Sequence, residues 1–140
     1  MSFFLDTDTF NHFHAGHPIV RARVVQAKRD ELAITIITRI EVLQGRFEFV
    51  RKAASATQLL TAQGRLTDSD RALAGWRIVP LDSAACAEFD RLRGIKGIRK
   101  IGRADLLIAC IVLANDATLV TRNVRDFAVI PSLKIENWVD

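Results

Sequence analysis

Residues 3–10 read FFLDTDTF, and this stretch decides how the rest of the chain is interpreted. The apolar residues 3–5 predict a short buried strand, and Asp6 follows directly at its carboxyl end. A carboxylate beside a core is costly unless a partner compensates its charge. We therefore expect Asp6 to belong to a site that the fold assembles, and not merely to a solvated loop or a helix cap.

Two further carboxylates lie beside apolar segments. Glu41 occurs in ITIITRIEVLQG, residues 34–45, and Asp105 occurs in IGRADLLIACIVLA, residues 101–114. If Asp6, Glu41 and Asp105 converge, they repel one another, and a bound divalent cation is the usual remedy. The pattern favours a metal-dependent hydrolase.

Each of these two acids also has a plainer interpretation as a helix-capping residue. The spacing Thr38-x-x-Glu41 matches a capping box, which predicts Glu41 in the first turn of a helix. Asp105 likewise falls at the start of an apolar helix, where the helix dipole favours negative charge. Taken singly, either acid could be only a cap, and the case for a site depends on all three occurring together.

Short strand-like runs alternate with longer helix-like runs along the chain. The predicted strands are residues 3–5, 33–36, 77–79, 118–120 and 134–136. The predicted helices are residues 19–29, 40–63, 69–75, 83–92 and 104–115. This order predicts an α/β fold, with helices on both faces of a central, mostly parallel sheet of four to five strands in three α/β/α layers. In such sheets the site lies beyond the carboxyl ends of the strands, where Asp6 and the segment from Thr121 to Asn123 fall.

Size and composition are those of one compact domain spanning residues 1–140. The longest nearly apolar stretch, residues 106–114, is too short to cross a bilayer, and no secretion signal is recognisable at the start. Cys86 and Cys110 form no C-x-x-C motif, and we expect both to be buried, reduced thiols. These features predict a cytoplasmic protein without membrane contact.

A basic segment leads directly to Asp105. The net charge of +4 and the pI of about 9.6 are only a modest bias towards polyanions. Residues 91–103, however, read RLRGIKGIRKIGR and contain no acid. The segment is either a solvated helix end and loop or a phosphate-binding surface beside the site.

Four ordered motifs and the tail resemble a known family. The stretches are FFLDTDTF (3–10), ITIITRIEVLQGR (34–46), IGRADLLIA (101–109), ATLVTRNVRDF (117–127) and IPSLKIENW (130–138). Together they resemble a PIN domain, and within that family the VapC-like toxin ribonucleases of type II toxin–antitoxin operons. The resemblance covers essentially the whole chain.

The resemblance implies roles for individual residues. Asp6, Glu41 and Asp105 match the acids that bind Mg²⁺ or Mn²⁺ in the family, and Thr121 matches the threonine that ends the fourth strand. The family often has a fourth acid two positions later, where this chain has Asn123, so the number of bound metals stays open. Asp126 is either a substitute for that acid or, as we prefer, a surface residue of a turn. Candidate RNA-binding residues are Arg99, Lys100, Arg103 and Arg122.

The resemblance also implies RNA as substrate, a homodimer and a cognate antitoxin whose tail covers the active site. The amphipathic stretch at residues 46–66, expected to continue one long helix, could supply a groove or dimer surface, although core packing explains it nearly as well. Phe47, Phe49, Trp76 and Phe89 are expected to pack between helices, although they could also stack on bases. The RNA sequence, the cleavage site and the antitoxin cannot be read from the chain.

Two other functions compete with the nuclease. Residues 6–9, DTDT, also match the nucleophile motif of haloacid-dehalogenase-like phosphatases, with Asp6 as nucleophile and Asp8 as acid and base. That family needs a paired-acid motif downstream, which is absent here. A non-catalytic PIN-like module that binds RNA or protein is the second alternative. The histidines at 12, 14 and 17 do not share a helical face, and we expect a helix end and a loop there.

Overall fold

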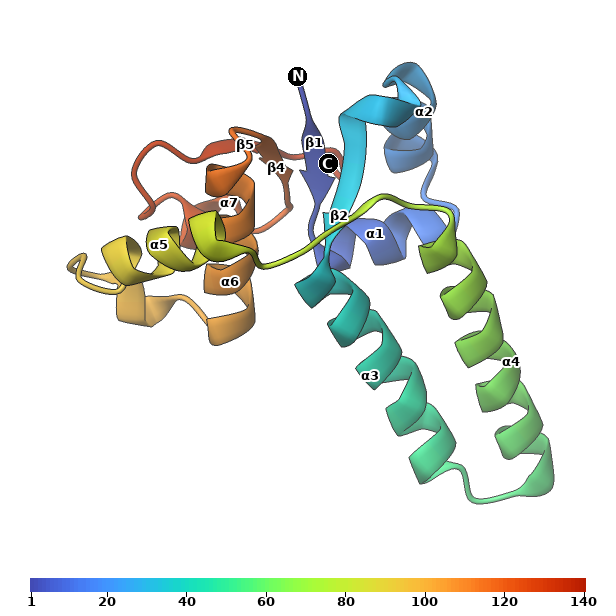
Figure 1. The fold of residues 1–140 in the computed structure, drawn as a ribbon. Coiled ribbons are helices and arrows are strands. Elements are labelled where there is room, and N and C mark those ends of the chain that lie inside the picture. The colour runs from blue at the N-terminus through green and yellow to red at the C-terminus, as the bar shows by residue number, and fades with distance from the viewer.

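The computed structural model describes residues 1–140 and contains a five-stranded parallel sheet between two layers of helices (Figure 1). The strands are β1 (Phe3–Leu5), β2 (Leu32–Thr35), β3 (Ile78–Val79), β4 (Thr118–Val120) and β5 (Lys134–Glu136). They pair in the order β3-β2-β1-β4-β5, and every pairing is parallel. The predicted α/β fold is confirmed, and no strand boundary differs from its prediction by more than one residue.

Seven α-helices and two short 3-10 turns connect and cover the strands. The helices are α1 (Thr7–His14), α2 (Pro18–Gln26), α3 (Ile36–Lys52), α4 (Ala56–Ala74), α5 (Ser83–Leu92), α6 (Arg103–Ala114) and α7 (Val124–Phe127). The turns are η1 (Arg29–Glu31) and η2 (Ile98–Lys100). The helix end and loop expected around the histidines are confirmed, because α1 ends at His14 and His17 caps α2.

The prediction of one helix over residues 40–63 is wrong. The backbone leaves the helical conformation at Ala53, and Ser55 begins a new helix by accepting a hydrogen bond from the backbone N–H of Gln58 at 3.1 Å. The new helix, α4, continues through the separately predicted helix at residues 69–75. The break contains neither glycine nor proline. The chain turns instead at a serine cap, and α4 then packs against α3.

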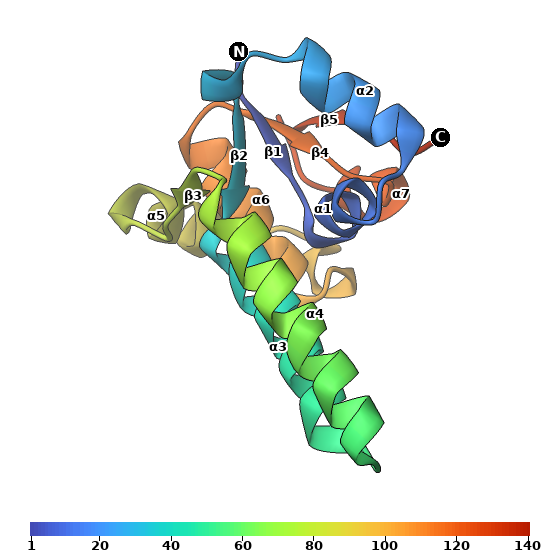
Figure 2. The same cartoon turned by 90° about the vertical axis from the view of Figure 1, so that its right-hand side faces the viewer.

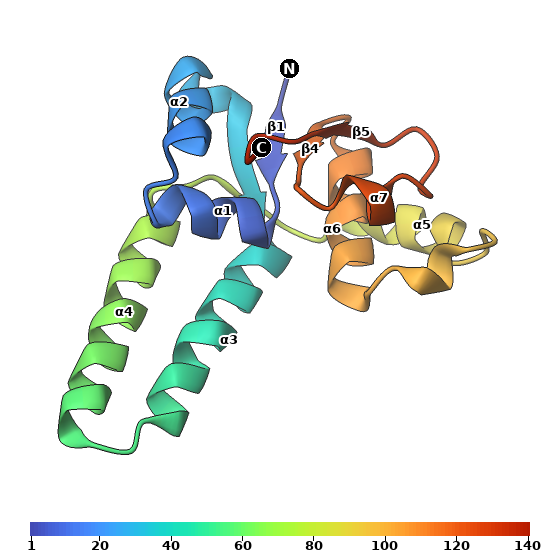
Figure 3. The ribbon, with the colours of Figure 1, turned by 180° about the vertical axis from the view of Figure 1, so that it is seen from behind.

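The helices α3 and α4 form a hairpin that projects from the body of the molecule (Figure 1, Figure 2 and Figure 3). Phe47 is 59% exposed and Phe49 is 50% exposed on this hairpin, so the expectation that both pack between helices is wrong. A two-helix projection has only one buried seam, and apolar residues off that seam remain in solvent. Trp76 and Phe89 are half-buried and do contact neighbouring elements, as expected.

The core is divided by the sheet into two layers, because alternate strand residues point to opposite faces. Phe4 belongs to the layer under α5, α6 and α7, whereas Leu5 belongs to the layer under α1 and α2. Full burial of such a side chain contributes roughly 1.5–3 kcal/mol. The sheet that presents Asp6 is thus fixed from both sides.

The two cysteines differ in environment, and the expectation that both are buried is wrong for Cys86. Cys86 is exposed on α5, while Cys110 is fully buried in α6. Burial raises the pKa of the Cys110 thiol to about 11, so this thiol stays protonated and unreactive. None of the helices is both long enough and apolar enough to span a membrane.

Candidate active site

A polar hollow of about 590 Å³ lies beyond the carboxyl ends of β1 and β4. The strand order reverses at this point, since the chain passes from β1 to β2 on one side and from β4 to β5 on the other. Such a switch point is where ligands bind in open α/β sheets. No apolar residue lines the hollow, which we call the carboxylate pocket; its lining residues are Asp6, Thr7, Asp8, Asn11, Glu41, Asp105, Arg122 and Asn123.

Asp6 is held rigidly at the floor of the carboxylate pocket and is only 6% exposed. One carboxylate oxygen accepts the backbone N–H of Thr9 at 2.9 Å, and the other accepts the hydroxyl of Thr121 at 2.6 Å. Asp6 is therefore the N-cap of α1 as well as a pocket residue, so the expectation that it resists the cap interpretation is wrong. Burial raises the pKa of Asp6 despite these hydrogen bonds, which act in the opposite direction.

Glu41 reaches the pocket from the second turn of α3, so its predicted position in a first turn is wrong. The hydroxyl of Thr35 accepts the backbone N–H of Thr38 at 3.2 Å and starts the helix at Ile36, one turn earlier than the capping box implied. The side chain of Glu41 therefore does not cap the helix. Its Oε1 accepts a hydrogen bond of 2.5 Å from the hydroxyl of Thr7, which is also hydrogen bonded to the hydroxyl of Thr38 at 3.2 Å.

Asp105 lies in the first turn of α6, as predicted, and is half-buried. Its pKa is raised to about 6, first by burial and then by the negative charges of Asp6, Glu41 and Asp126. The three predicted acids therefore share one electrostatic environment. A cation between them would relieve the repulsion that raises this pKa.

Thr121 and Asn123 follow β4; Thr121 is buried against Asp6, and Asn123 lines the pocket. The buried hydroxyl of Thr121 donates to Asp6 and accepts the backbone N–H of Asn123 at 3.0 Å. The side-chain amide of Asn123 donates to Asp126 at 3.0 Å, which leaves the amide oxygen without a hydrogen-bond partner. Asp126 is exposed in the first turn of α7 and does not line the pocket.

Only one of the four candidate RNA-binding cations lines the carboxylate pocket. Arg122 lines the carboxylate pocket and pairs with Asp140 at 3.4 Å. Arg103 begins α6, and its guanidinium lies 4.8 Å from the ring centroid of Phe89. Arg99 and Lys100 are exposed in η2, outside the pocket lining, and follow Gly97, whose φ of +89° favours glycine.

Sequence reasoning missed Thr7 and Asn11 as pocket residues, and it assigned Asp8 only to the phosphatase alternative. All three lie on α1, of which only the end near the histidines was predicted. A signal was present, because Asp6 is a good N-cap and Phe10 and Phe13 are spaced for one helical face. The strong strand pattern ends at Leu5, and the helix starts only two residues later.

The donor set of the pocket fits a hard divalent cation. Carboxylate, hydroxyl and amide oxygens are the ligands that Mg²⁺ takes in proteins, usually with several waters retained. No group of three Asp, Glu, His or Cys side chains is arranged closely enough to hold a metal ion by itself. The three predicted acids face one pocket but do not by themselves form a closed ligand set in this structure.

A parallel sheet of this order, with an acidic pocket at its switch point, is the architecture of a PIN domain, and the PIN domain family model matches residues 3–133. The chain is also 30% identical to Ribonuclease VapC2 of Rickettsia felis over 143 aligned residues, covering 99% of this chain and 98% of that protein. The chain belongs to the PIN domain family and, within it, to the VapC proteins. The resemblance seen in the sequence motifs is confirmed, and the haloacid-dehalogenase alternative is wrong.

Solved structures support the same assignment. The fold matches VapBC-1 from nontypeable Haemophilus influenzae with a TM-score of 0.80 at 23% identity, covering 100% of both chains. It matches VapBC2 from Rickettsia felis, bound to a DNA fragment from its promoter, with a TM-score of 0.75 at 26% identity and 99% coverage of both chains.

Proposed function

We propose that this chain is a Mg²⁺-dependent endoribonuclease, with Mn²⁺ as an alternative metal, and the toxin of a type II toxin–antitoxin pair. The observation that carries the proposal is the convergence of Asp6, Glu41 and Asp105 on one wholly polar pocket. Membership of the VapC group, whose relatives are named ribonucleases, gives the reaction class. The whole chain, residues 1–140, acts as one nuclease domain in this proposal.

Asp6, Glu41 and Asp105 would hold the cation, directly or through water, and the amide oxygen of Asn123 is a neutral donor at the rim. When bound, Mg²⁺ supplies charge neutralisation at the phosphate and lowers the pKa of the attacking water. The uncharged Asn123 makes a second metal site weaker than one with a fourth carboxylate. RNA products would bear 5′-phosphate and 3′-hydroxyl ends.

The remaining residues hold the acids and the substrate in place. Thr121 and Thr9 fix both oxygens of Asp6, and Thr7 fixes one oxygen of Glu41, so the carboxylates cannot turn away from the reacting phosphate. Cationic side chains would bind the RNA backbone around the pocket; the candidates are Arg99, Lys100, Arg103 and Arg122.

An antitoxin protein and a second copy of this chain are the proposed partners. The solved relatives are VapBC assemblies, which supports an antitoxin partner here. The α3–α4 hairpin exposes Phe47, Phe49 and Leu60, an apolar surface of the kind that binds another protein. A short reading frame for a DNA-binding protein immediately upstream, whose product abolishes cleavage by the purified chain, would identify the antitoxin.

The activity test is cleavage of total RNA by the purified protein. We expect cleavage with Mg²⁺ or Mn²⁺, none with EDTA, and none by the Asp6→Asn and Asp105→Asn variants in either metal. Asp68→Asn is the matched control, since Asp68 is exposed on α4 and makes no ion pair. Retained RNA binding without any cleavage by the parent protein would instead support the non-catalytic module.

A further inference from the structure

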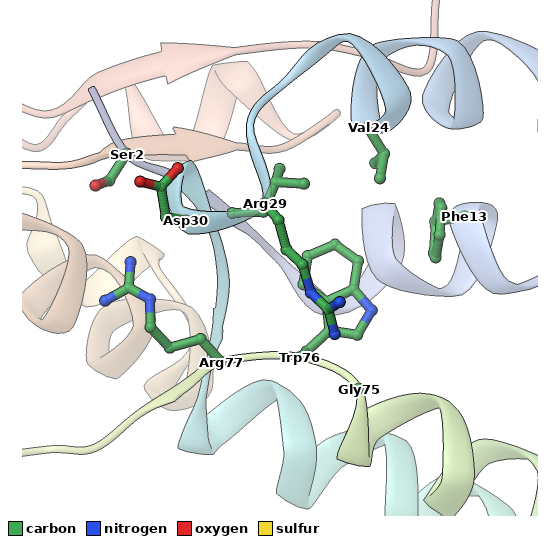
Figure 4. A pocket seen from close by; sticks show the side chains of 9 residues that line it. Ser2, Phe13, Val24, Arg29, Asp30, Gly75, Trp76 and Arg77 are labelled. Atoms are coloured by element: carbon green, nitrogen blue, oxygen red, sulfur yellow. The ribbon is translucent and has the colours of Figure 1, made fainter.

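A second hollow lies at the opposite edge of the sheet from the carboxylate pocket. Its volume is about 920 Å³, and most of its lining comes from segments that precede strands (Figure 4). We call it the tryptophan pocket; the lining residues used below are Phe13, Val24, Arg29, Asp30, Trp76 and Arg77. None of its lining residues is shared with the carboxylate pocket.

The aromatic wall of the tryptophan pocket is held in a fixed orientation. The indole of Trp76 packs edge-on against Phe10, with ring centroids 5.7 Å apart, and against Phe13, with ring centroids 5.5 Å apart. Phe10 is fully buried, whereas Trp76 is only half-buried and borders the hollow. A half-exposed ring that does not need to be ordered on binding is a good stacking surface for a planar ligand.

Two guanidinium groups line the same hollow without an acidic partner. Neither Arg29 nor Arg77 lies within ion-pair distance of any carboxylate, and the guanidinium of Arg77 lies 5.7 Å from the ring centroid of Phe4. Arg21 of α2, whose guanidinium lies 5.8 Å from the ring centroid of Phe13, is also outside every ion pair. Unpaired arginines beside an aromatic wall favour a ligand that is both planar and anionic.

The carboxylate of Asp30 indicates that the ligand also carries a hydrogen-bond donor. Asp30 lines the hollow and forms no ion pair with either arginine, so its carboxylate remains available to hydroxyl or amino donors. In Figure 4, Asp30 and Arg77 lie towards one end of the hollow and Phe13 and Val24 towards the other, with Arg29 and Trp76 between them. A simple aromatic acid would satisfy the arginines but leave this acceptor unused.

We propose that the tryptophan pocket binds a nucleoside phosphate. The base stacks on Trp76, the phosphate is bound by Arg29 and Arg77, and a ribose hydroxyl or base amino group donates to Asp30. The site is separate from the carboxylate pocket, and its occupation does not depend on nuclease activity. The ligand is either a free mononucleotide or one nucleotide of a bound RNA.

The test uses the two tryptophans as reporters. Trp76 lines the hollow, whereas Trp138 is buried beside Phe3 and does not line it, so their indole N–H signals in a ¹H–¹⁵N spectrum distinguish the site from the core. Trp76→Phe assigns the signals. Titration with AMP, GMP, CMP and UMP is expected to shift the Trp76 signal saturably without moving Trp138. The matching uncharged nucleosides should bind at least about tenfold more weakly, because they lack the group that the arginines bind.

Arginine variants test whether Arg29 and Arg77 bind the phosphate of the nucleotide. The double variant Arg29→Ala with Arg77→Ala should weaken nucleotide binding at least about tenfold. Arg65→Ala should change it by less than about twofold, because Arg65 is an exposed arginine over Phe49 on the distant hairpin. Absence of a saturable Trp76 shift at about 10 mM of all four nucleotides, or equal affinity in the double variant, overturns the proposal.

A further titration separates the two sources of the ligand. A short RNA is added to the Asp105→Asn variant, which is expected not to cleave it. Saturation of the Trp76 shift at lower concentration than for mononucleotides supports the proposal with RNA as the ligand. Saturation at equal or higher concentration supports it with the free nucleotide as the ligand.

Discussion

The carboxylate pocket and the tryptophan pocket lie at opposite edges of one sheet and are built from different kinds of side chain. The first is lined mainly by acids, amides and a threonine, with Arg122 as its one arginine, and Asp6 owes its position directly to the backbone because it caps α1. The second combines an aromatic wall with long arginines. In parallel sheets every strand ends at the same edge, so short polar residues placed after strands meet there without long reach. The opposite edge, where segments enter the sheet, needs larger side chains to close a hollow.

The largest expected effect separates the two pockets by function. Asp105→Asn should reduce RNA cleavage by roughly a thousandfold or more, because it removes a charge that, in the proposed function, would face the bound cation. At saturating RNA, Arg77→Ala should leave the cleavage rate within about twofold, because Arg77 is not part of the carboxylate pocket. Single-turnover cleavage rates in Mg²⁺ measure both. A comparable loss in both variants would show that the pockets are not functionally distinct.

The next effect concerns how the carboxylates are held. Thr7→Val removes the hydroxyl that donates to Glu41 at 2.5 Å, and we expect a 10- to 100-fold loss of activity and of Mn²⁺ affinity, roughly the effect of losing a supporting hydrogen bond at a metal site. Thr7→Ser keeps the hydroxyl and should retain most of both. Calorimetric Mn²⁺ titration gives the affinity independently of turnover. If the serine and valine variants behave alike, Thr7 acts through packing and not through its hydroxyl.

A smaller effect concerns stability and pH in the absence of metal. The folded-state pKa of Asp105, about 6, lies above its ordinary 3.8, so ionisation opposes folding. This penalty is full above about pH 6 and disappears as the pH falls towards 4. Asp105→Asn should therefore stabilise the protein at pH 8 in EDTA by about 1 kcal/mol, allowing for screening at a half-buried site, and by nothing near pH 4.

Urea denaturation of the Asp105→Asn variant and the parent protein at both pH values measures this difference. Asp68→Asn, on the exposed face of α4, should show no such pH dependence. Addition of Mg²⁺ should stabilise the parent protein more than the variant, since binding to the folded state raises stability. A gain that is the same at pH 4 and pH 8 would contradict the assigned electrostatic cause.

The smallest effect tests the neutral residue at the rim. Asn123→Asp adds a further carboxylate to the pocket, next to Asp126, and should raise Mn²⁺ affinity by roughly threefold while lowering the stability of the metal-free protein. Calorimetry and urea denaturation in EDTA measure the two changes. Because Asn123 also contacts Asp126, Asp126→Asn is the matched variant that removes the neighbouring charge. An unchanged affinity in Asn123→Asp would show that the rim does not contact the cation.

Sequence predicted most of the sheet and the three acids because both signals are local. An apolar run followed by Asp6, or by Thr121, identifies a strand and the residue at its end in a single short stretch. Asp105 was placed correctly for the same reason, since its helix is apolar for most of its length. Where a functional residue directly follows or begins a strand or helix, the local sequence pattern was sufficient to predict both.

Features that depend on contacts between distant segments could not be predicted. The break at Ala53 is stabilised by packing of α3 against α4, and the turn holding Glu41 was set by a cap at Thr35 that competes with the equally good pattern at Thr38. The hydrogen bond from Thr7 to Glu41 joins residues that only the folded sheet brings together. The exposure of Phe47 likewise follows from the projection of the hairpin, which hydrophobicity alone does not reveal.

Helix α1 is a short rod with one end at each hollow. Its cap, Asp6, belongs to the carboxylate pocket, and Phe13 in its last turn supports Trp76 at the other edge. The same eight-residue helix thus contributes a side chain to each hollow. Amide exchange along α1 is therefore a single measurement in which both sites can be compared.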